Sequence, residues 1–340
     1  PRSTPSNSSA ASDVYKRQKL MHALVLHGGE GTAAQVLAGL EWVLHPYTCD
    51  GQEVPIKPDI VSLSLGALGN YSDVFFEPVS KLIESNITVV AAIGNGGPGT
   101  SANPGNIWGV IGVGALKRDD TIADFSSSEV VEWPSPPKEW PFKDTYPSKY
   151  IKPDFAAPGV YIPGAYVINR YYVIASGTSA AAPITAGVIA LITEAYKKLL
   201  NRSPTVNEVY DILNKTSQKV CKSSRCGWGV VNAIKAVSYV LNRTLSEVKI
   251  LTNVSTIKTP GYVRVLAPAS MTYYIDYYRL GRGRSITLLI PPSDMGYHYI
   301  HGIGDGYYGY AKIYVKPNIV VSNKTVIVGD LITFNITGFP

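Results

Sequence analysis

Three nearly continuous apolar segments recur in the first two thirds of the chain, and they constrain its fold more than any other feature. They span residues 59–65, 87–93 and 110–116. A strand that is apolar on both sides must be buried on both faces, and such burial is typical of parallel sheets covered by helices. Amphipathic helical patterns follow Thr32 and span residues 74–85. The sequence therefore predicts an α/β fold built on a doubly wound parallel sheet with right-handed crossovers.

The ends of the predicted strands place three residues at one edge of this sheet. Gly66, Asn95 and Ser179 each come just past the end of a predicted strand. Ligands of open parallel sheets bind outside the carboxyl ends of the strands. We therefore expect these three residues to lie near one cleft.

The run from Gly177 to Pro183 presents a hydroxyl group where a loop turns into a helix. Gly177 permits an unusual backbone conformation ahead of Ser179, and Pro183 suits the first turn of a helix. Unpaired N–H groups and the positive end of the helix dipole surround a serine at this position, and such donors stabilise an oxyanion. Taken alone, Ser179 could equally be the N-cap of a buried helix.

Six segments in order resemble the subtilisin-like serine proteases, the subtilases, over roughly residues 20–241. They are residues 62–66, 91–98, 123–127, 152–159, 177–183 and 227–233. The resemblance implies a subtilisin-like fold and hydrolysis of polypeptide substrates through an acyl-enzyme on Ser179. It also implies that the Asn95 amide and the Ser179 backbone N–H bind the oxyanion. Substrate contacts are implied for Ser64, Leu65, Gly66, Ala92, Ile93 and Gly94.

The same resemblance requires a catalytic base and its orienting carboxylate, and neither motif is found. No Asp-Ser/Thr-Gly segment occurs, and His27-Gly28-Gly29 lacks the Thr-His of the family's histidine segment. We expect the chain to be truncated at its N-terminus, with Asp and His outside it, and to be inactive by itself. The alternative is a pseudoprotease that acts as an extracellular binding or surface-layer protein. A non-proteolytic serine hydrolase would need Gly-x-Ser-x-Gly, but Ser179 is followed by two alanines.

The composition of the chain changes along its length and predicts further parts. Residues 1–18 are polar and serine-rich and are expected to be a non-native or disordered leader. We expect a partial peptidase domain over 19–246, which opens with a strand over 20–26, a small all-β sandwich over 247–318, and the start of a truncated Ig-like domain over 319–340. Residues 129–150 are rich in Pro and Trp and predict a surface loop.

The β domain is rich in tyrosine, because eleven of the 23 tyrosines lie between Tyr262 and Tyr314. Aromatic faces suit sugar rings, so contact with carbohydrate or a cell surface is one interpretation. The other is ordinary packing of tyrosines along the edges of a β-sheet domain.

The charge and the cysteine content limit which binding partners and which cellular compartment we expect. The net charge is +6, but Lys and Arg form no run and no nucleic-acid motif occurs, so we expect no nucleic-acid partner. No stretch of 18 apolar residues occurs, so we expect no membrane span. Cys221 and Cys226 bracket a short loop and predict a disulfide, although half of a metal site would show the same spacing. Nine Asn-x-Ser/Thr sequons favour an extracellular glycoprotein. The chemistry requires no cofactor or metal, and structural calcium is expected only from the family resemblance.

Overall fold

The computed structural model describes residues 19–337 apart from 70, 143–144, 166–171, 222, 242–245, 259, 276–277, 292–295, 305, 317 and 322–333. The expected leader over 1–18 therefore lies outside the described residues. The chain divides into two compact units, Pro1–Leu241 and Asn242–Pro340.

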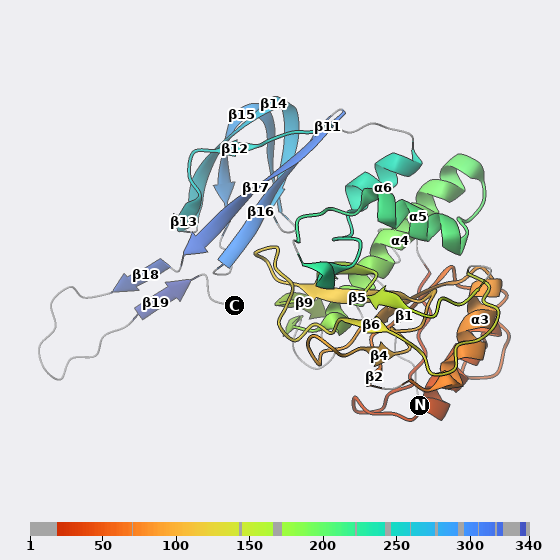
Figure 1. Ribbon diagram of the computed structural model, residues 1–340. Helices are drawn as coiled ribbons and strands as arrows, with labels where there is room; N and C mark the ends of the chain where they lie inside the picture. Colours follow the sequence, from red (N-terminus) through yellow and green to blue (C-terminus); the bar gives the residue numbers. More distant parts are fainter. Residues whose placement is uncertain are drawn as a thin grey trace, which may run out of the picture. The chain divides into compact units, whose positions relative to one another are not determined.

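A four-stranded parallel sheet forms the centre of the first unit (Figure 1). Its order is β1 (Ile60–Leu63), β3 (Thr88–Ala92), β5 (Ile111–Leu116) and β8 (Phe155–Pro158). Every residue of β3 and β5 is buried, as their continuous apolar sequences predict. The prediction of burial on both faces is wrong for β1, where Ser62 is exposed. Within the described sheet β1 is an edge strand, so only part of it is covered.

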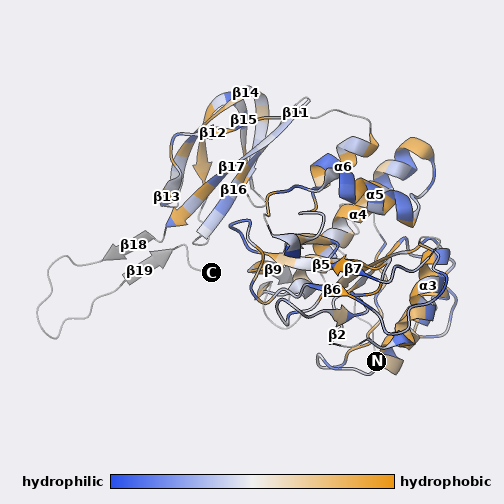
Figure 2. Ribbon diagram, viewed as in Figure 1, coloured by the Kyte–Doolittle hydropathy of each residue, from blue (hydrophilic) through white to orange (hydrophobic). Residues whose placement is uncertain are grey.

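Helices cover both faces of this sheet, which confirms the doubly wound α/β fold. They are α2 (Ala33–Leu44), α3 (Phe76–Glu84), α4 (Thr178–Leu200), α5 (Val206–Thr216) and α6 (Ala233–Val240). Side chains of α2 and α3 pack on one face with Val89 and Ala91, and side chains of α4, α5 and α6 pack on the other with Val90 and Ala92. Alternate residues of β3 thus face different cores. Helices α3, α5 and α6 carry both hydrophobic and hydrophilic residues, as half-covered helices must (Figure 2).

The longest helix, α4, runs across the sheet and contacts all four of its strands. It is 23 residues long and is the one helix among the described residues whose length and apolar composition would suffice to cross a membrane. Half of its most apolar window is buried against the sheet. The core of the unit accounts for this composition, so α4 is weak evidence for a membrane segment.

The strand expected over residues 20–26 is not formed. Val25 and Leu26 pack against the core cluster under α2, whereas Leu20 and Leu24 are 50% and 69% exposed. Strand-forming residues make a strand only where a second backbone edge pairs with them. In the described part of the chain, residues 19–26 have no such partner.

The Pro- and Trp-rich segment is folded inward, so the prediction of a surface loop is wrong for its aromatic side chains. It lies between β6 (Glu129–Val131) and β7 (Tyr150–Lys152), which pair antiparallel. Its buried aromatic side chains are Trp133, Trp140, Phe142, Tyr146 and Tyr150. They form part of the core cluster on the α2 and α3 side of the sheet.

Shorter elements connect these parts of the first unit. They are β2 (Ala67–Leu68) paired with β4 (Ala102–Asn103), β9 (Ile162–Ala165) paired with β10 (Tyr172–Ala175), η1 (Asp73–Phe75) and η2 (Ser224–Cys226). The predicted disulfide is confirmed: Cys221 and Cys226 are bonded, with their Cα atoms 6.4 Å apart, and the bridge encloses η2.

The second unit is all-β, as predicted, and seven of its strands join in one sheet. They are β11 (Ser246–Glu247), β12 (Leu251–Thr252), β13 (Thr256–Lys258), β14 (Gly261–Ile275), β15 (Tyr278–Ile290), β16 (Gly296–Gly304) and β17 (Tyr307–Lys316). The register of β14 shifts between Leu266 and Met271, so its first half pairs with β12 and its second half with β16. One long strand thereby connects two groups of strands around a single apolar core.

The end of the chain holds one further strand pair. β18 (Asn318–Val321) pairs antiparallel with β19 (Phe334–Thr337). The run over residues 325–334, which was expected to form the opening hairpin of the Ig-like domain, lies, except for Phe334, outside the described residues.

Candidate active site

Ser179 lies in the first turn of α4, and its residue is exposed. Gly177 caps the helix with φ +157° and ψ 162°, a conformation that is essentially restricted to glycine. The Gly177 N–H donates to the carbonyl of Gly159 at 2.8 Å, which ties the cap to the segment after β8. The sequence around Ser179 therefore fixes the start of α4 and leaves the hydroxyl accessible.

Two hydrogen bonds join Ser179 to Ser64, which follows β1. The Ser64 hydroxyl donates to the carbonyl oxygen of Ser179 at 2.8 Å, and the Ser179 hydroxyl donates to the carbonyl oxygen of Ser64 at 3.2 Å. The two residues are 115 positions apart in the sequence. These two hydrogen bonds hold the segment after β1 against the start of α4 at Ser179.

Asn95 lies against the same helix start and is oriented by Thr178. Its Oδ1 accepts from the backbone N–H of Thr178 at 2.9 Å and from the Thr178 hydroxyl at 3.0 Å. The N–H of Gly94 donates to the same hydroxyl at 3.2 Å. Because these contacts occupy Oδ1, the amide nitrogen of Asn95 is the end left to donate beside Ser179. The positioning role of Thr178 was missed in the sequence, although Thr178 directly precedes Ser179 in the same run.

A cavity of about 700 Å³ brings most of the predicted substrate-contact residues together. It is lined by Ser64, Leu65, Gly66, Ala92, Gly94, Asn95 and Ser179. Ile93 does not line this cavity, so its expected role as a wall is not supported by the structure. Ile93 is fully buried, and a Cβ built on Gly112 of β5 would lie 3.4 Å from its Cδ1 atom. Ile93 directly follows β3, and its N–H still donates to the carbonyl of Val113 in β5, so its side chain points to the side opposite that of Ala92.

The facing wall of the cavity comes from the start of α2 and the turn before it. The apolar residues Leu26 and Val36 line this wall together with Glu30, and Phe75 of η1 also lines the cavity. Among the described residues that line the cavity, Glu30 is the one ionisable residue, and none is a histidine. A general base for Ser179 is therefore not found within this described lining.

No group of three or more His, Cys, Asp or Glu residues that could hold a metal ion occurs within the part of the chain that the structure describes. The expectation of structural calcium continues to rest on the family resemblance alone.

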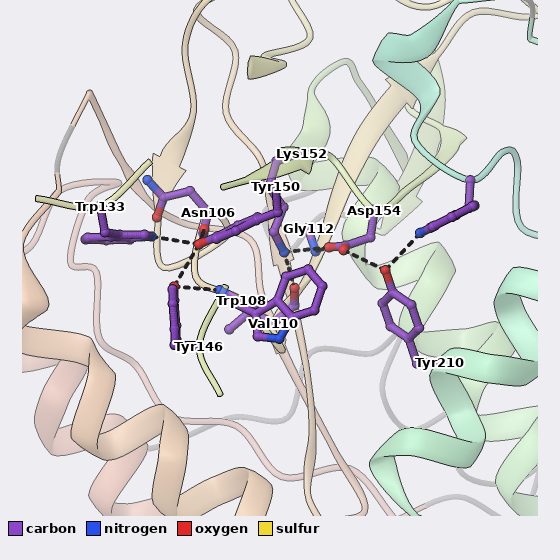
Figure 3. Close-up of polar contacts among 11 residues, drawn as sticks. Asn106, Trp108, Val110, Gly112, Trp133, Tyr146, Tyr150, Lys152, Asp154 and Tyr210 are labelled. Atoms are coloured by element: carbon purple, nitrogen blue, oxygen red, sulfur yellow. Dashed lines mark hydrogen bonds and ion pairs between the residues drawn. The ribbon is translucent and has the colours of Figure 1, made fainter. Parts of the chain in front are cut away.

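A second polar cluster is buried beside the sheet (Figure 3), and none of its labelled residues lines this cavity. Lys152 and Asp154 form an ion pair at 2.6 Å, with side chains that are 0% and 5% exposed. Asp154 Oδ2 also accepts from the N–H of Gly112 at 2.7 Å, and Oδ1 accepts from the Tyr210 hydroxyl at 3.1 Å. Burial lowers the pKa of Lys152, while the adjacent Asp154 carboxylate opposes this shift. The pair lies in a segment that resembles the subtilases, but its burial was not predicted.

Tyrosines extend this cluster into the aromatic segment (Figure 3). The Tyr150 hydroxyl accepts from Trp133 Nε1 at 2.7 Å and donates to the carbonyl of Asn106 at 2.7 Å. It also lies 2.7 Å from the Tyr146 hydroxyl. Burial raises the pKa of Tyr146 to about 12 and that of Tyr150 still further. These hydroxyls therefore stay neutral and act as fixed hydrogen-bonding groups inside the fold.

The sequence model of the subtilase family matches residues 3–229, which is more than half of the chain. The chain belongs to the subtilase family. The match starts inside the segment expected to be a leader, and it includes Ser64, Asn95 and Ser179. Subtilases are a family of serine peptidases.

Two curated relatives come from Bacillus subtilis (strain 168). Bacillopeptidase F is 33% identical over 224 residues, which cover 62% of this chain and 14% of that protein. Serine protease AprX is 34% identical over 240 residues, which cover 62% of this chain and 49% of that protein. The chain thus spans at most about half the length of these relatives.

A solved structure supports the fold independently. The crystal structure of a lanthipeptide protease superimposes with a TM-score of 0.51 at 18% identity, covering 68% of this chain and 74% of that one. At this identity the likeness concerns the fold, and it agrees with the α/β architecture described above.

Proposed function

We propose that this chain supplies the nucleophile, the oxyanion donors and the substrate-binding edge of a subtilisin-type serine endopeptidase. One observation carries the proposal: Ser64, Asn95 and Ser179, from three distant segments, meet in one cavity at the start of α4. An exposed hydroxyl, a side-chain amide and helix N-terminal N–H groups are the nucleophile and the oxyanion donors that acyl transfer requires, in addition to a base.

In the proposed reaction, Ser179 Oγ attacks the carbonyl carbon of the peptide bond, and a base takes its proton. The Asn95 amide and the Ser179 backbone N–H stabilise the negative oxygen of the tetrahedral intermediate. The C–N bond then breaks, the amine leaves with the proton, and the acyl group stays on Ser179. Water hydrolyses this ester and restores the hydroxyl.

The substrate backbone would lie along residues 64–66. These residues follow the edge strand β1 and line the cavity next to Ser179. An extended peptide that adds to such an edge gains main-chain hydrogen bonds without needing a particular side chain. This would place its scissile carbonyl at the start of α4.

The catalytic base and its orienting carboxylate are proposed to come from outside the described residues. The support is that no histidine lines the cavity in the described part of the chain. The same observation favours the second candidate function, a pseudoprotease that binds polypeptides without cleaving them.

An extracellular location is also a proposal, supported by the Cys221–Cys226 disulfide and by nine glycosylation sequons. For the tyrosine-rich second unit, ordinary packing has more support than carbohydrate binding. The rings of Tyr297 and Tyr314 meet edge-on at 5.0 Å, and those of Tyr299 and Tyr310 at 5.7 Å.

Hydrolysis of peptide anilides tests the proposal, with the purified chain and the full-length gene product assayed side by side. We expect turnover by the full-length product, loss of turnover in Ser179→Ala, and at most trace turnover by the chain alone. Ser80→Ala, on α3 and outside the cavity lining, is the matched control and should keep full activity. Activity that survives in Ser179→Ala would overturn the nucleophile, and fast turnover by the chain alone would overturn the missing base.

A further inference from the structure

A tight turn fixes the position of Glu30 at the cavity wall. Gly28 and Gly29 have φ values of +67° and +92°, the positive values that a two-residue type I′ turn needs at both central positions. His27 and Glu30 pair across this turn as an antiparallel bridge, and the Glu30 N–H donates to the His27 carbonyl at 3.4 Å. Thr32 then caps α2, so the turn is held from both sides.

The carboxylate of Glu30 stands without a charge partner in the described structure. It forms no hydrogen bond or ion pair with the other described residues, and no other described residue of the cavity lining carries a charge. Glu30 is exposed, and the residues that line the cavity with it include the apolar Leu26 and Val36. The cavity that holds Ser179 is therefore negatively charged at one wall and uncharged elsewhere in its described lining.

A peptide in this cavity must pass the carboxylate. Residues 64–66 and residues 29–31 line the same cavity, so a backbone laid along the first segment comes near the second. Extended residues advance by about 3.3 Å each, which brings only a few side chains on either side of the scissile bond within reach of the turn.

From this arrangement we infer that Glu30 selects peptides that carry Lys or Arg within about four residues of the scissile bond. The inference rests on the proposed peptidase function and names its substrate class. The alkyl part of Lys or Arg packs on the apolar wall while its charge meets the carboxylate. An apolar side chain would cover the carboxylate without pairing it, and an acidic one would repel it.

Fluorogenic peptides test this inference on the full-length gene product. Each of four positions on either side of the bond is varied among Lys, Arg, norleucine and Glu, and kcat/KM is measured at low salt. We expect a preference for Lys over norleucine at one position or more, about fivefold for a partly exposed charge pair. Glu30→Gln should remove this preference, and Glu30→Lys should replace it with a preference for Glu.

Glu41→Gln is the matched control, because Glu41 is an exposed carboxylate on α2 outside the cavity lining. It changes the net charge by the same amount and should leave the preference intact. Equal kcat/KM for Lys and norleucine at every position, or a preference that survives in Glu30→Lys, would overturn the inference.

A measurement of peptide binding distinguishes a failure of this inference from a failure of the proposed function. If no peptide is cleaved, the proposed function fails, and fluorescein-labelled Lys and norleucine peptides are then titrated onto full-length Ser179→Ala by fluorescence anisotropy. About fivefold tighter binding of the Lys peptide, lost in the added Glu30→Gln, supports the role of Glu30. Equal affinities overturn it, whether or not cleavage is seen.

Discussion

Two polar clusters lie beside the same sheet of the first unit, and they differ mainly in burial. Around Ser179, the hydroxyl is exposed and its partner is the backbone carbonyl of Ser64. Around Lys152 and Asp154, the charges are buried and bonded to each other. Removing an exposed hydroxyl leaves no buried group unpaired, whereas removing half of a buried ion pair leaves a charge inside the protein. Exposed polar groups are thus available for chemistry, whereas buried polar groups stabilise the fold.

Replacing Ser179 by alanine should separate the two clusters most sharply. We expect peptide hydrolysis by the full-length product to fall about 10⁶-fold, the size of the loss in subtilisin, a member of this family. The free energy of unfolding should change by less than about 0.5 kcal/mol, because the hydroxyl is exposed. Activity and urea unfolding of the same preparation check both values, and a large loss of stability would contradict the comparison.

Replacing Asp154 by alanine should show the opposite pattern. We expect the free energy of unfolding to fall by about 3–5 kcal/mol, because Lys152 is left buried without its partner. Urea unfolding of the purified chain measures this loss.

The double variant Lys152→Met, Asp154→Leu is the control for Asp154→Ala. It removes both charges, so it should recover part of the stability lost in the single variant. A loss below about 1 kcal/mol in Asp154→Ala would mean that the buried pair does not support the fold.

Replacing Asn95 by leucine should affect the rate more than binding. In the full-length product we expect kcat to fall about 10²–10³-fold with little change in KM, the range known for this type of donor in subtilisin. Thr178→Val should have a smaller effect, because it keeps the backbone contact to Asn95 and removes only the hydroxyl contacts. A KM effect without a kcat effect would place Asn95 in substrate binding instead.

The smallest expected effect on stability concerns an exposed ion pair. The Arg202 guanidinium donates a hydrogen bond to the Glu208 carboxylate and lowers the pKa of this carboxyl from 4.5 to about 2. Because the folded-state pKa lies below the unfolded value, the stabilisation is full above pH 4.5 and is lost as the pH falls towards 2. Glu208→Gln should therefore lower the unfolding midpoint at pH 7 and match the wild type near pH 2. An exposed pair contributes at most about 1 kcal/mol, and a difference that does not depend on pH would contradict this assignment.

The sequence predicts those parts of the fold that depend on local pattern. The apolar runs of β3 and β5 identify buried parallel strands, and the rule on strand ends brings Asn95 and Ser179 together. Features that depend on distant neighbours were not predicted. Residues 20–26 form no strand because nothing in the described chain pairs with them, and Asp154 meets Tyr210 across 56 positions of sequence.

Side-chain direction explains the remaining differences at the site. Ala92 ends β3 and Ile93 continues its extended backbone, so their side chains point to opposite sides and, of the two, only Ala92 lines the cavity. Glu30 has no catalytic pattern around it in the sequence, and only the turn that carries it brings it to the wall of the cavity. The family resemblance therefore locates the proposed reacting groups, whereas the residue that we propose selects the substrate is found only from the structure.

Labelling of the full-length gene product with a fluorophosphonate tests the central claim most directly. The reagent forms a covalent bond with an activated serine, and mass spectrometry of the digested protein identifies the modified residue. We predict a single adduct on Ser179, formed in parallel with the loss of peptide hydrolysis and absent from Ser179→Ala. An adduct on another serine that abolishes hydrolysis, or an intact protein that neither reacts nor cleaves peptides, would contradict the assignment of Ser179 as the nucleophile of a working peptidase.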